Sequence, residues 1–339
     1  MWRMSPESET RAPKREAGRL RTVIIAFAAN FLVAVAKSLA ALITGSASMV
    51  AEAAHSWADT GNEIFLMLAE RRSSKPRDSA HPDGYGREAY VWSLIAAFGL
   101  FTAGAVFSIM HGIAELTRAE PVNNFGVAYV VLAVSFVFEG ISFAQSYMQA
   151  HRMADERGTG TLEHVLVTSN TTLRAVFAED AAALVGLVIA FLGVLTHQLT
   201  GNSVYDAIGS ILVGVLLGIV AIILIDRNRR FLVGQPASDA VTDSVLAVLL
   251  ARDEIEKVTY LHLEFVGPEQ FNLVAAVDLA GDHPESDVAA EFLAIGRELE
   301  KSPYILGAVL TLSLPGAKAL VPAHPDENRS NAKTIADSF

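Results

Sequence analysis

The sequence contains no cysteine among its 339 residues. This excludes disulfide bonds, thiolate metal sites and cysteine nucleophiles, and leaves histidine and carboxylate side chains as the strong metal ligands. Basic residues are also scarce: 26 Lys and Arg stand against 37 Asp and Glu, and the net charge of −11 argues against a nucleic-acid partner. No nucleophile-and-base motif occurs, so we predict that the protein is not an enzyme.

What the chain has in excess is apolar sequence. Hydrophobic residues make up 52% of it, and the mean hydropathy is +0.37. A helix needs about 20 residues to cross about 30 Å of hydrocarbon. Six stretches reach that length: Thr22–Thr44, Ser46–Ala69, Ala89–Leu116, Phe125–Met148, Leu173–Leu195 and Val204–Ile225. The sequence therefore predicts a multi-pass integral membrane protein with six transmembrane helices in the lipid bilayer.

The basic residues predict the orientation of these helices. Within residues 1–230, seventeen Lys and Arg lie before the first stretch, at the connections that follow the second and fourth stretches, or just after the sixth. The opposite loops hold only Arg118. Cytoplasmic loops of membrane proteins carry the excess of Lys and Arg. We therefore expect the N- and C-termini to be cytoplasmic, and we expect the membrane to be the plasma (inner) membrane of a bacterium.

The pattern changes after Arg230. Apolar residues alternate from Leu261 to Phe265 and from Phe271 to Leu279, which predicts two strands joined by a turn at Gly267 and Pro268. A helix near Val241–Ala251, another through Val288–Leu299 and a strand within Ile305–Leu314 complete the order αββαβ. The predicted organisation is a disordered tail (1–18), a transmembrane domain (19–230), a small α+β cytoplasmic domain (231–314) and a second disordered tail (315–339).

Ionisable residues cluster within two of the apolar stretches. Glu52, His55, Asp59 and Glu63 lie along one stripe of the second stretch. Because each such group costs roughly 2.5 to 3.5 kcal/mol to insert, each is a functional candidate by default. For Glu52 and Glu63, however, a helix-end or packing role is favoured over metal ligation. His55 and Asp59, four residues apart, can ligate one ion, and a carboxylate from a facing helix can complete a site suited to Zn²⁺. The alternative interpretation is a buried pair that fixes helix packing.

Three segments carry a family resemblance. The run Gly45–Asp59, the loop His81–Arg87 and Asp206 resemble the cation diffusion facilitator family of metal/proton antiporters, and the similarity extends from Arg19 to Leu314. This resemblance implies a metallochaperone-like C-terminal domain and a homodimer.

The resemblance also implies a transport site built from two residues on the second span and two on the fifth. Carried over, these are His55, Asp59 and Asp180, whereas the fourth position falls on Val176, which has no ligand atom. The run that begins with Glu179 and Asp180 resembles the branch related to the mitochondrial zinc transporter nine, in which an adjacent Glu replaces the missing ligand. Glu179 is thus the fourth candidate.

A second metal site of the family lies in the loop between the second and third spans. Here the resemblance implies Asp78 and His81 as its ligands, while Tyr85 stands where some members have a third. A turn role for His81 is the alternative interpretation.

Together these features predict a divalent metal efflux transporter that exchanges metal for protons by alternating access. Zn²⁺ is the expected cargo, and Mn²⁺, Fe²⁺, Co²⁺ and Cd²⁺ suit the same ligands. No prosthetic group is expected. The rival from another class is a non-transporting membrane anchor whose C-terminal domain dimerises or senses metal, in which case Asp59 and Asp180 would be dispensable.

Overall fold

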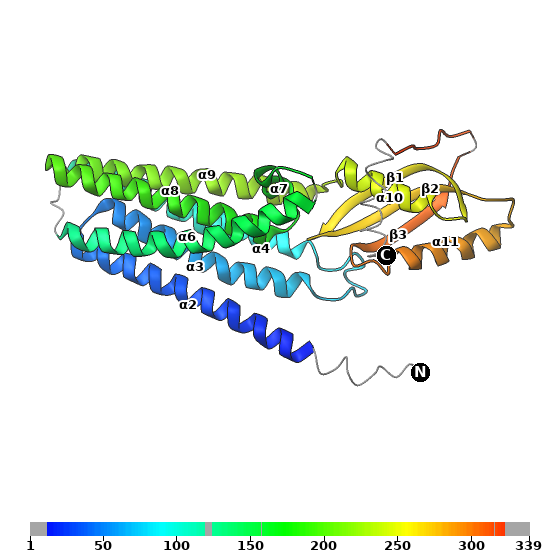
Figure 1. Cartoon of the computed structure of the whole chain (residues 1–339), viewed down its shortest axis with the longest axis horizontal. Coiled ribbons are helices and arrows are strands. Elements are labelled where there is room, and N and C mark those ends of the chain that lie inside the picture. Colours follow the sequence, from blue (N-terminus) through cyan, green and yellow to red (C-terminus); the bar gives the residue numbers. More distant parts are fainter. Residues whose placement is uncertain (1–11, 119–123, 157, 315, 323–339) are drawn as a thin grey trace. The chain divides into compact units, whose positions relative to one another are not determined.

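The computed structural model describes residues 12–118, 124–156, 158–314 and 316–322, with side chains from residue 27 onward. The described chain divides into two compact units, and the three strands belong to the second (Figure 1). Unit 1 comprises the described residues of Met1–Met67, Ser93–Val167 and Thr172–Asp226, and unit 2 those of Leu68–Trp92, Thr168–Thr171 and Arg227–Phe339. Unit 2 thus contains three segments that the sequence prediction assigned to the transmembrane domain (19–230), namely residues 68–92, 168–171 and 227–230.

Helices make up nearly all of unit 1, and several of them continue into unit 2. They are α2 (Ala12–Thr44), α3 (Ala47–Ser73), α4 (Glu88–Ala96), the π-helix η1 (Ala97–Phe101), α5 (Thr102–Arg118), α6 (Phe125–Glu156), α7 (Thr161–Val167), α8 (Thr171–Thr200) and α9 (Val204–Val233). The π-helix joins α4 to α5, so that Glu88–Thr117 is one candidate span. π-Helical turns of this kind are frequent near functional sites.

Five helical segments in the described part of the chain are long and apolar enough to cross a membrane. They are Phe27–Thr44, Glu88–Thr117, Phe125–Asp155, Thr171–Thr200 and Val204–Val233. The sixth predicted span, α3, is 27 residues long but does not qualify by composition. The reason is its charge, because Glu52, Asp59, Glu63 and Glu70 interrupt the apolar sequence.

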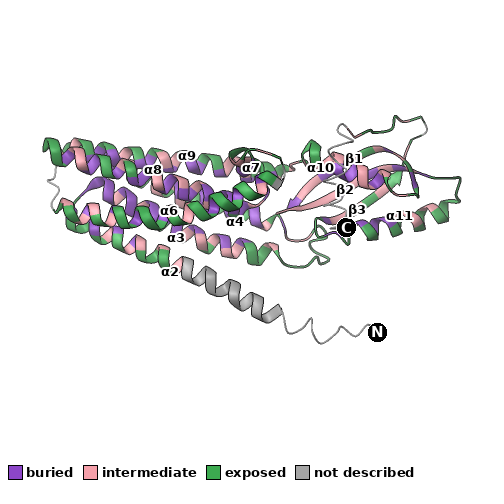
Figure 2. Cartoon of the chain, viewed as in Figure 1, coloured by how far each residue is buried: buried purple, intermediate pink, exposed green. Residues whose placement is uncertain are grey.

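Large apolar side chains lie on the outside of these helices. Leu42 of α2 is 82% exposed, Phe98 of η1 is 69% exposed and Ile222 of α9 is 68% exposed. Figure 2 shows exposed and buried residues interleaved along the same helices. Exposed Leu, Phe and Ile at this density suit a hydrocarbon solvent, in which apolar surface has no reason to be buried.

Small residues let α5 and α9 approach closely. A methyl group added to Gly214 of α9 would lie 2.9 Å from the backbone oxygen of Ala105 on α5, and one added to Gly112 would lie 2.8 Å from the backbone oxygen of Ala207. Glycines at such contacts are typical of packed transmembrane helices, because they allow the two backbones to meet.

The C-terminal part of unit 2 confirms the predicted order αββαβ. Its elements are α10 (Asp239–Leu250), β1 (Ile255–Gly267), β2 (Gln270–Leu279), α11 (Glu285–Leu299) and β3 (Ile305–Leu312). β1 pairs with β2 in antiparallel fashion, β2 pairs with β3 in parallel fashion, and the sheet order is β1-β2-β3. Leu249, Val258, Leu273 and Leu299 are buried in the core between the sheet and the two helices.

The structure describes part of each predicted tail. α2 begins at Ala12, inside the predicted tail 1–18, and residues 1–11 lie outside the described residues. Pro13 suits a first helical turn, and Lys, Arg, Glu and Ala are strong helix formers, so the helix starts before the apolar sequence. In the predicted tail 315–339, Leu320 donates a backbone hydrogen bond of 2.7 Å to Val258 of β1, and residues 315 and 323–339 are outside the described residues.

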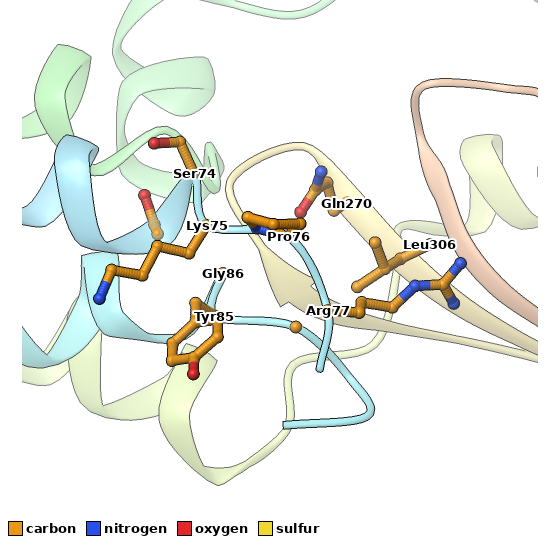
Figure 3. Close-up of a pocket in the computed structure, with 10 residues that line it drawn as sticks. Ser74, Lys75, Pro76, Arg77, Tyr85, Gly86, Gln270 and Leu306 are labelled. Carbon is orange, nitrogen blue, oxygen red and sulfur yellow. The ribbon is translucent and has the colours of Figure 1, made fainter. Parts of the chain in front are cut away.

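Unit 2 also includes the loop between α3 and α4, which lies against the sheet. A pocket of about 310 Å³ separates the loop from Gln270 and Leu306 (Figure 3). Both cations at its rim have partners: the Lys75 amine lies 5.5 Å from the centre of the Tyr85 ring, and Arg77 lies 3.8 Å from Glu300. We therefore interpret this pocket as a packing gap between the loop and the sheet, and not as a ligand-binding site.

Candidate metal site

The start of α3 is fixed by Asp206 of α9. One oxygen of this carboxylate accepts hydrogen bonds from the Ser46 hydroxyl (2.8 Å) and the Ser48 N–H (3.2 Å), and the other accepts from the Ala47 N–H (2.6 Å). These N–H groups have no partner within the helix, and a carboxylate is also favoured by the helix dipole there. Asp206 thereby sets the position of the helix that carries the candidate ligands.

His55 and Asp59 are buried side by side on α3. His55 Nε2 lies 3.2 Å from Asp59 Oδ2, and the two side chains are 2% and 12% exposed. Their orientation does not make a hydrogen bond, and His55 Nε2 and Asp59 Oδ1 have no hydrogen-bond partner among the described residues. One turn of α3 therefore presents an imidazole nitrogen and a carboxylate oxygen without competing donors.

Glu179 of α8 faces α3. Its Oε1 accepts a hydrogen bond of 2.5 Å from Asn62 Nδ2, and Asn62 lies three residues after Asp59. Both residues of this pair are buried. The structure thus brings Glu179 to the same face of α3 as the His55 and Asp59 pair, about one turn further along the helix.

Asp180 faces α6 instead. Its Oδ2 accepts hydrogen bonds from the hydroxyls of Ser142 (2.9 Å) and Ser146 (3.3 Å). Adjacent residues on a helix point about 100° apart, which explains why Asp180 and Glu179 contact different helices. Val176, at the position where the family resemblance places a fourth ligand, is a half-buried apolar residue.

The four predicted ligands do not form one coordination sphere in this conformation. Within the described residues, no three His, Asp or Glu side chains are close enough to hold a metal ion together. His55 and Asp59 are in contact, whereas Glu179 and Asp180 are held by neutral hydrogen-bond donors of α3 and α6. Bringing a carboxylate of α8 to the α3 pair requires that it leave these donors.

Three neutral donors at this site were not identified from the sequence as functional. Asn62 shares the stripe of Asp59, so helical spacing could have found it. Ser142 and Ser146 lie four residues apart on α6, but serine is common in membrane helices, and its spacing alone carries little information.

The predicted second pair, Asp78 and His81, lies at a turn in unit 2. Asp78 Oδ1 accepts hydrogen bonds from the backbone N–H of Ala80 (2.9 Å) and His81 (2.8 Å), and its Oδ2 accepts from the Tyr85 hydroxyl (2.7 Å). His81 Nδ1 is 3.4 Å from Asp78, and its ring is 4.0 Å from that of Tyr85. The contacts are those of an Asx-type turn, and the second metal site stays a prediction.

Comparison with known proteins identifies the family. Residues 23–233 match the cation efflux transmembrane domain, and the chain belongs to the cation diffusion facilitator family. It is therefore a multi-pass membrane protein of a family of metal efflux transporters.

Two groups of relatives support this assignment. The chain is 36% identical to metal tolerance protein C4 of Arabidopsis thaliana and 34% identical to the mitochondrial proton-coupled zinc antiporter SLC30A9 of Xenopus laevis, each over 261 residues. These matches cover 77% of this chain but 57% and 47% of the relatives, so the chain spans about half the length of the curated relatives that it matches. It is also 22% identical over 277 residues to magnetosome protein MamB of Paramagnetospirillum magneticum, covering 81% of this chain and 87% of that protein.

Proposed function

We propose that this protein exports Zn²⁺ in exchange for protons, by alternating access around His55 and Asp59. The observation that carries the proposal is the buried pair on one turn of α3, in which neither His55 Nε2 nor Asp59 Oδ1 has a hydrogen-bond partner among the described residues. The relatives named proton-coupled zinc antiporter agree with it. An imidazole with carboxylates also suits Mn²⁺, Fe²⁺, Co²⁺ and Cd²⁺, so these ions are the competing cargoes.

Glu179 and Asp180 supply the remaining ligands in this proposal. Glu179 is held by Asn62, and Asp180 by Ser142 and Ser146. Neutral donors hold a carboxylate without supplying positive charge, so an arriving metal ion competes with hydrogen bonds and not with ion pairs. A rotation or shift of α8 would exchange these donors for the metal and would give the second state that alternating access requires.

His55 provides the coupling to protons. Metal ions bind the neutral imidazole, and an ordinary histidine titrates near pH 6.5. Binding from one side releases a proton, and protonation from the other side favours release of the metal. Proton entry and metal exit are thereby linked at one side chain.

The setting of the site is part of the same proposal. The distribution of Lys and Arg supports cytoplasmic termini. We place the chain in the inner membrane of a bacterium as a homodimer, with Zn²⁺ and protons as its partners. We retain Asp78 and His81 as a second metal site within this proposal.

Flux measurements in proteoliposomes test the function. The purified full chain is reconstituted and offered Zn²⁺, Mn²⁺, Fe²⁺, Co²⁺ and Cd²⁺ at two pH gradients. We expect Zn²⁺ flux that rises with the gradient and is lost in His55→Ala and Asp180→Ala. Asp155→Asn, which changes an exposed carboxylate at the end of α6, is the matched control and should transport normally. Wild-type flux in His55→Ala would show that the site is assigned wrongly.

A further inference from the structure

A fully buried ion pair connects α2 to α3 in unit 1. Lys37 Nζ lies 2.9 Å from Glu52 Oε2, and both side chains are 0% exposed. Removing two charges from solvent is costly, and apolar residues of similar volume often replace a buried pair with no loss of stability. Charges inside membrane spans are therefore functional candidates by default.

Glu52 lies next to the transport site. It precedes His55 by three residues, so the two side chains share one face of α3. Its second oxygen, Oε1, is buried and has no hydrogen-bond partner among the described residues. Three side-chain atoms that accept or donate no hydrogen bond within the described part of the chain thus follow one another along two turns of the helix: Glu52 Oε1, His55 Nε2 and Asp59 Oδ1.

The backbone of α8 lies directly against this free oxygen. A methyl group added to Gly186 would lie 2.6 Å from Glu52 Oε1. Gly186 comes six residues after Asp180 on the helix that carries the other two predicted ligands. A movement of α8 that repositions Glu179 and Asp180 therefore also changes the space in front of Glu52.

We propose that Glu52 is a further divalent-cation ligand, one step beyond the His55 and Asp59 pair toward the α3 N-terminus, and that Lys37 is its resident counter-cation. The inference rests on the proposed transport function. When no metal is present, the Lys37 ammonium group pairs with the Glu52 carboxylate and neutralises its buried charge. A metal ion that leaves Asp59 displaces Lys37 from Glu52, and the nearby ammonium then repels the ion and shortens its stay.

Three variants separate this role from a structural one. Lys37→Met keeps the length of the side chain but frees the Glu52 carboxylate, Glu52→Gln keeps its shape but removes the charge, and the double variant does both. Zn²⁺ binding to the purified full chain is measured by calorimetry, and Zn²⁺ flux is measured in proteoliposomes. Ser38→Ala is the matched control, because it removes a neighbouring contact between α2 and α3, the 3.0 Å hydrogen bond from Trp57 Nε1, without changing charge.

We expect Lys37→Met to bind Zn²⁺ about tenfold more tightly and to transport it more slowly, since the repelling charge is gone. The double variant should lose this tightening, because the carboxylate is absent. Ser38→Ala should bind with wild-type affinity. Equal affinity of Lys37→Met and wild type, or tightening that persists in the double variant, would overturn the proposal.

Two further outcomes are decisive. Lys37→Met leaves the Glu52 charge uncompensated, and if this variant does not fold, the neutral double variant replaces it. A lower kcat of Zn²⁺ transport at unchanged KM in the double variant supports the proposal, and a wild-type kcat overturns it. If the wild-type chain binds Zn²⁺ but transports none, the transport function fails, and the affinity comparison still decides whether Lys37 opposes metal at Glu52.

Discussion

Neutral hydrogen-bond donors hold the carboxylates of unit 1 at several positions. Asn62 donates to Glu179 (2.5 Å), Ser142 donates to Asp180 (2.9 Å), and Asn30 donates to Glu63 (2.6 Å). Lys37 is the exception, since it neutralises Glu52 with a charge. This division suits a transport path in which the metal first binds the carboxylates that neutral donors hold, and displaces those donors.

Asn62→Ala should destabilise the protein. It leaves the buried Glu179 carboxylate without this donor, and a buried polar group that loses its partner costs about 1 to 3 kcal/mol. We expect a lower melting temperature of the purified chain. The matched change Asn30→Ala should have a smaller effect, because its partner Glu63 is only half-buried. Equal melting temperatures of Asn62→Ala and wild type would contradict the assigned contact.

Asp78 and Tyr85 form a pH-sensitive contact in the loop between α3 and α4. The Tyr85 hydroxyl and the His81 N–H, both donating to Asp78, lower the pKa of its carboxyl, and the same contact raises the pKa of the Tyr85 phenol. The ionised Asp78 carboxylate stabilises the loop at pH values above the ordinary Asp pKa. This stabilisation is lost as the pH falls through the lowered pKa of Asp78. For Tyr85, the stabilisation is present below the ordinary Tyr pKa and is lost as pH rises through the raised value.

Asp78→Ala should therefore make Tyr85 ionise at a lower pH, nearer the ordinary pKa of about 10. Phenolate absorbance during an alkaline titration measures the ionisation of all tyrosines. Subtracting the titration of the Tyr85→Phe variant gives the ionisation of Tyr85 alone. An unchanged midpoint in Asp78→Ala would show that the hydrogen bond does not form in solution.

At the scale of helices and strands, periodicity predicted most of the fold. Apolar runs located the five candidate spans, and alternation located β1 and β2. The turn between these strands is formed by Pro268 and Glu269, one residue later than predicted, because Gly267 still belongs to β1. The π-helix η1 was not predicted, and it packs closely against α3: a methyl group on Gly61 would lie 2.8 Å from Leu100 Cδ1. A local sequence pattern does not record such contacts between helices.

The site was predictable only within one helix. The i, i+4 spacing predicted the contact of His55 with Asp59, and the structure contains it. The sequence did not indicate which of Glu179 and Asp180 faces α3, because that depends on the rotation of α8 about its own axis. That rotation results from the packing of α8 against α3 and α6, so it requires the three-dimensional structure.

Two glycines of α9 give a matched test of helix packing. In Gly214→Ala, the new methyl group would meet the backbone of Ala105 and Ile109 at 2.9 Å, so α5 and α9 must separate. In Gly218→Ala, the nearest atom is Ala105 Cβ at 3.8 Å, an ordinary contact. We expect Gly214→Ala to lower the melting temperature and Gly218→Ala to leave it unchanged or raise it, because Ala favours helix by about 1 kcal/mol over Gly. The opposite order would rule out this close approach of α5 and α9.

For the whole molecule, the distribution of charge matters more than its sum. Residues 231–339 contain 7 basic and 17 acidic residues, so nearly all of the net charge of −11 belongs to the C-terminal part. A surface of one charge sign attracts cations and repels anionic lipid headgroups. The charges that the proposed function needs are the few that lie inside the apolar helices.

Unit 2 combines segments that are far apart in the sequence. Arg87 of the loop after α3 lies 2.7 Å from Glu264 of β1, and Asp83 accepts a hydrogen bond of 3.1 Å from Asn272 of β2. The loop thereby connects the end of α3, the helix with the candidate ligands, to the sheet. Its attachment depends on a close approach at Gly86.

Gly86→Ala should detach this loop from the sheet. A methyl group there would lie 2.5 Å from the backbone oxygen of Val266 and 2.7 Å from Gly267 Cα, and backbone atoms cannot move aside as a flexible side chain can. We expect trypsin to cut the full-length protein after Arg77 faster than in wild type, since a released loop is open to proteolysis. Gly160→Ala, whose new methyl group would have its nearest neighbour at 3.9 Å, is the control and should be cut at the wild-type rate. If Gly86→Ala is cut no faster than this control, the loop is not held to the sheet through Gly86.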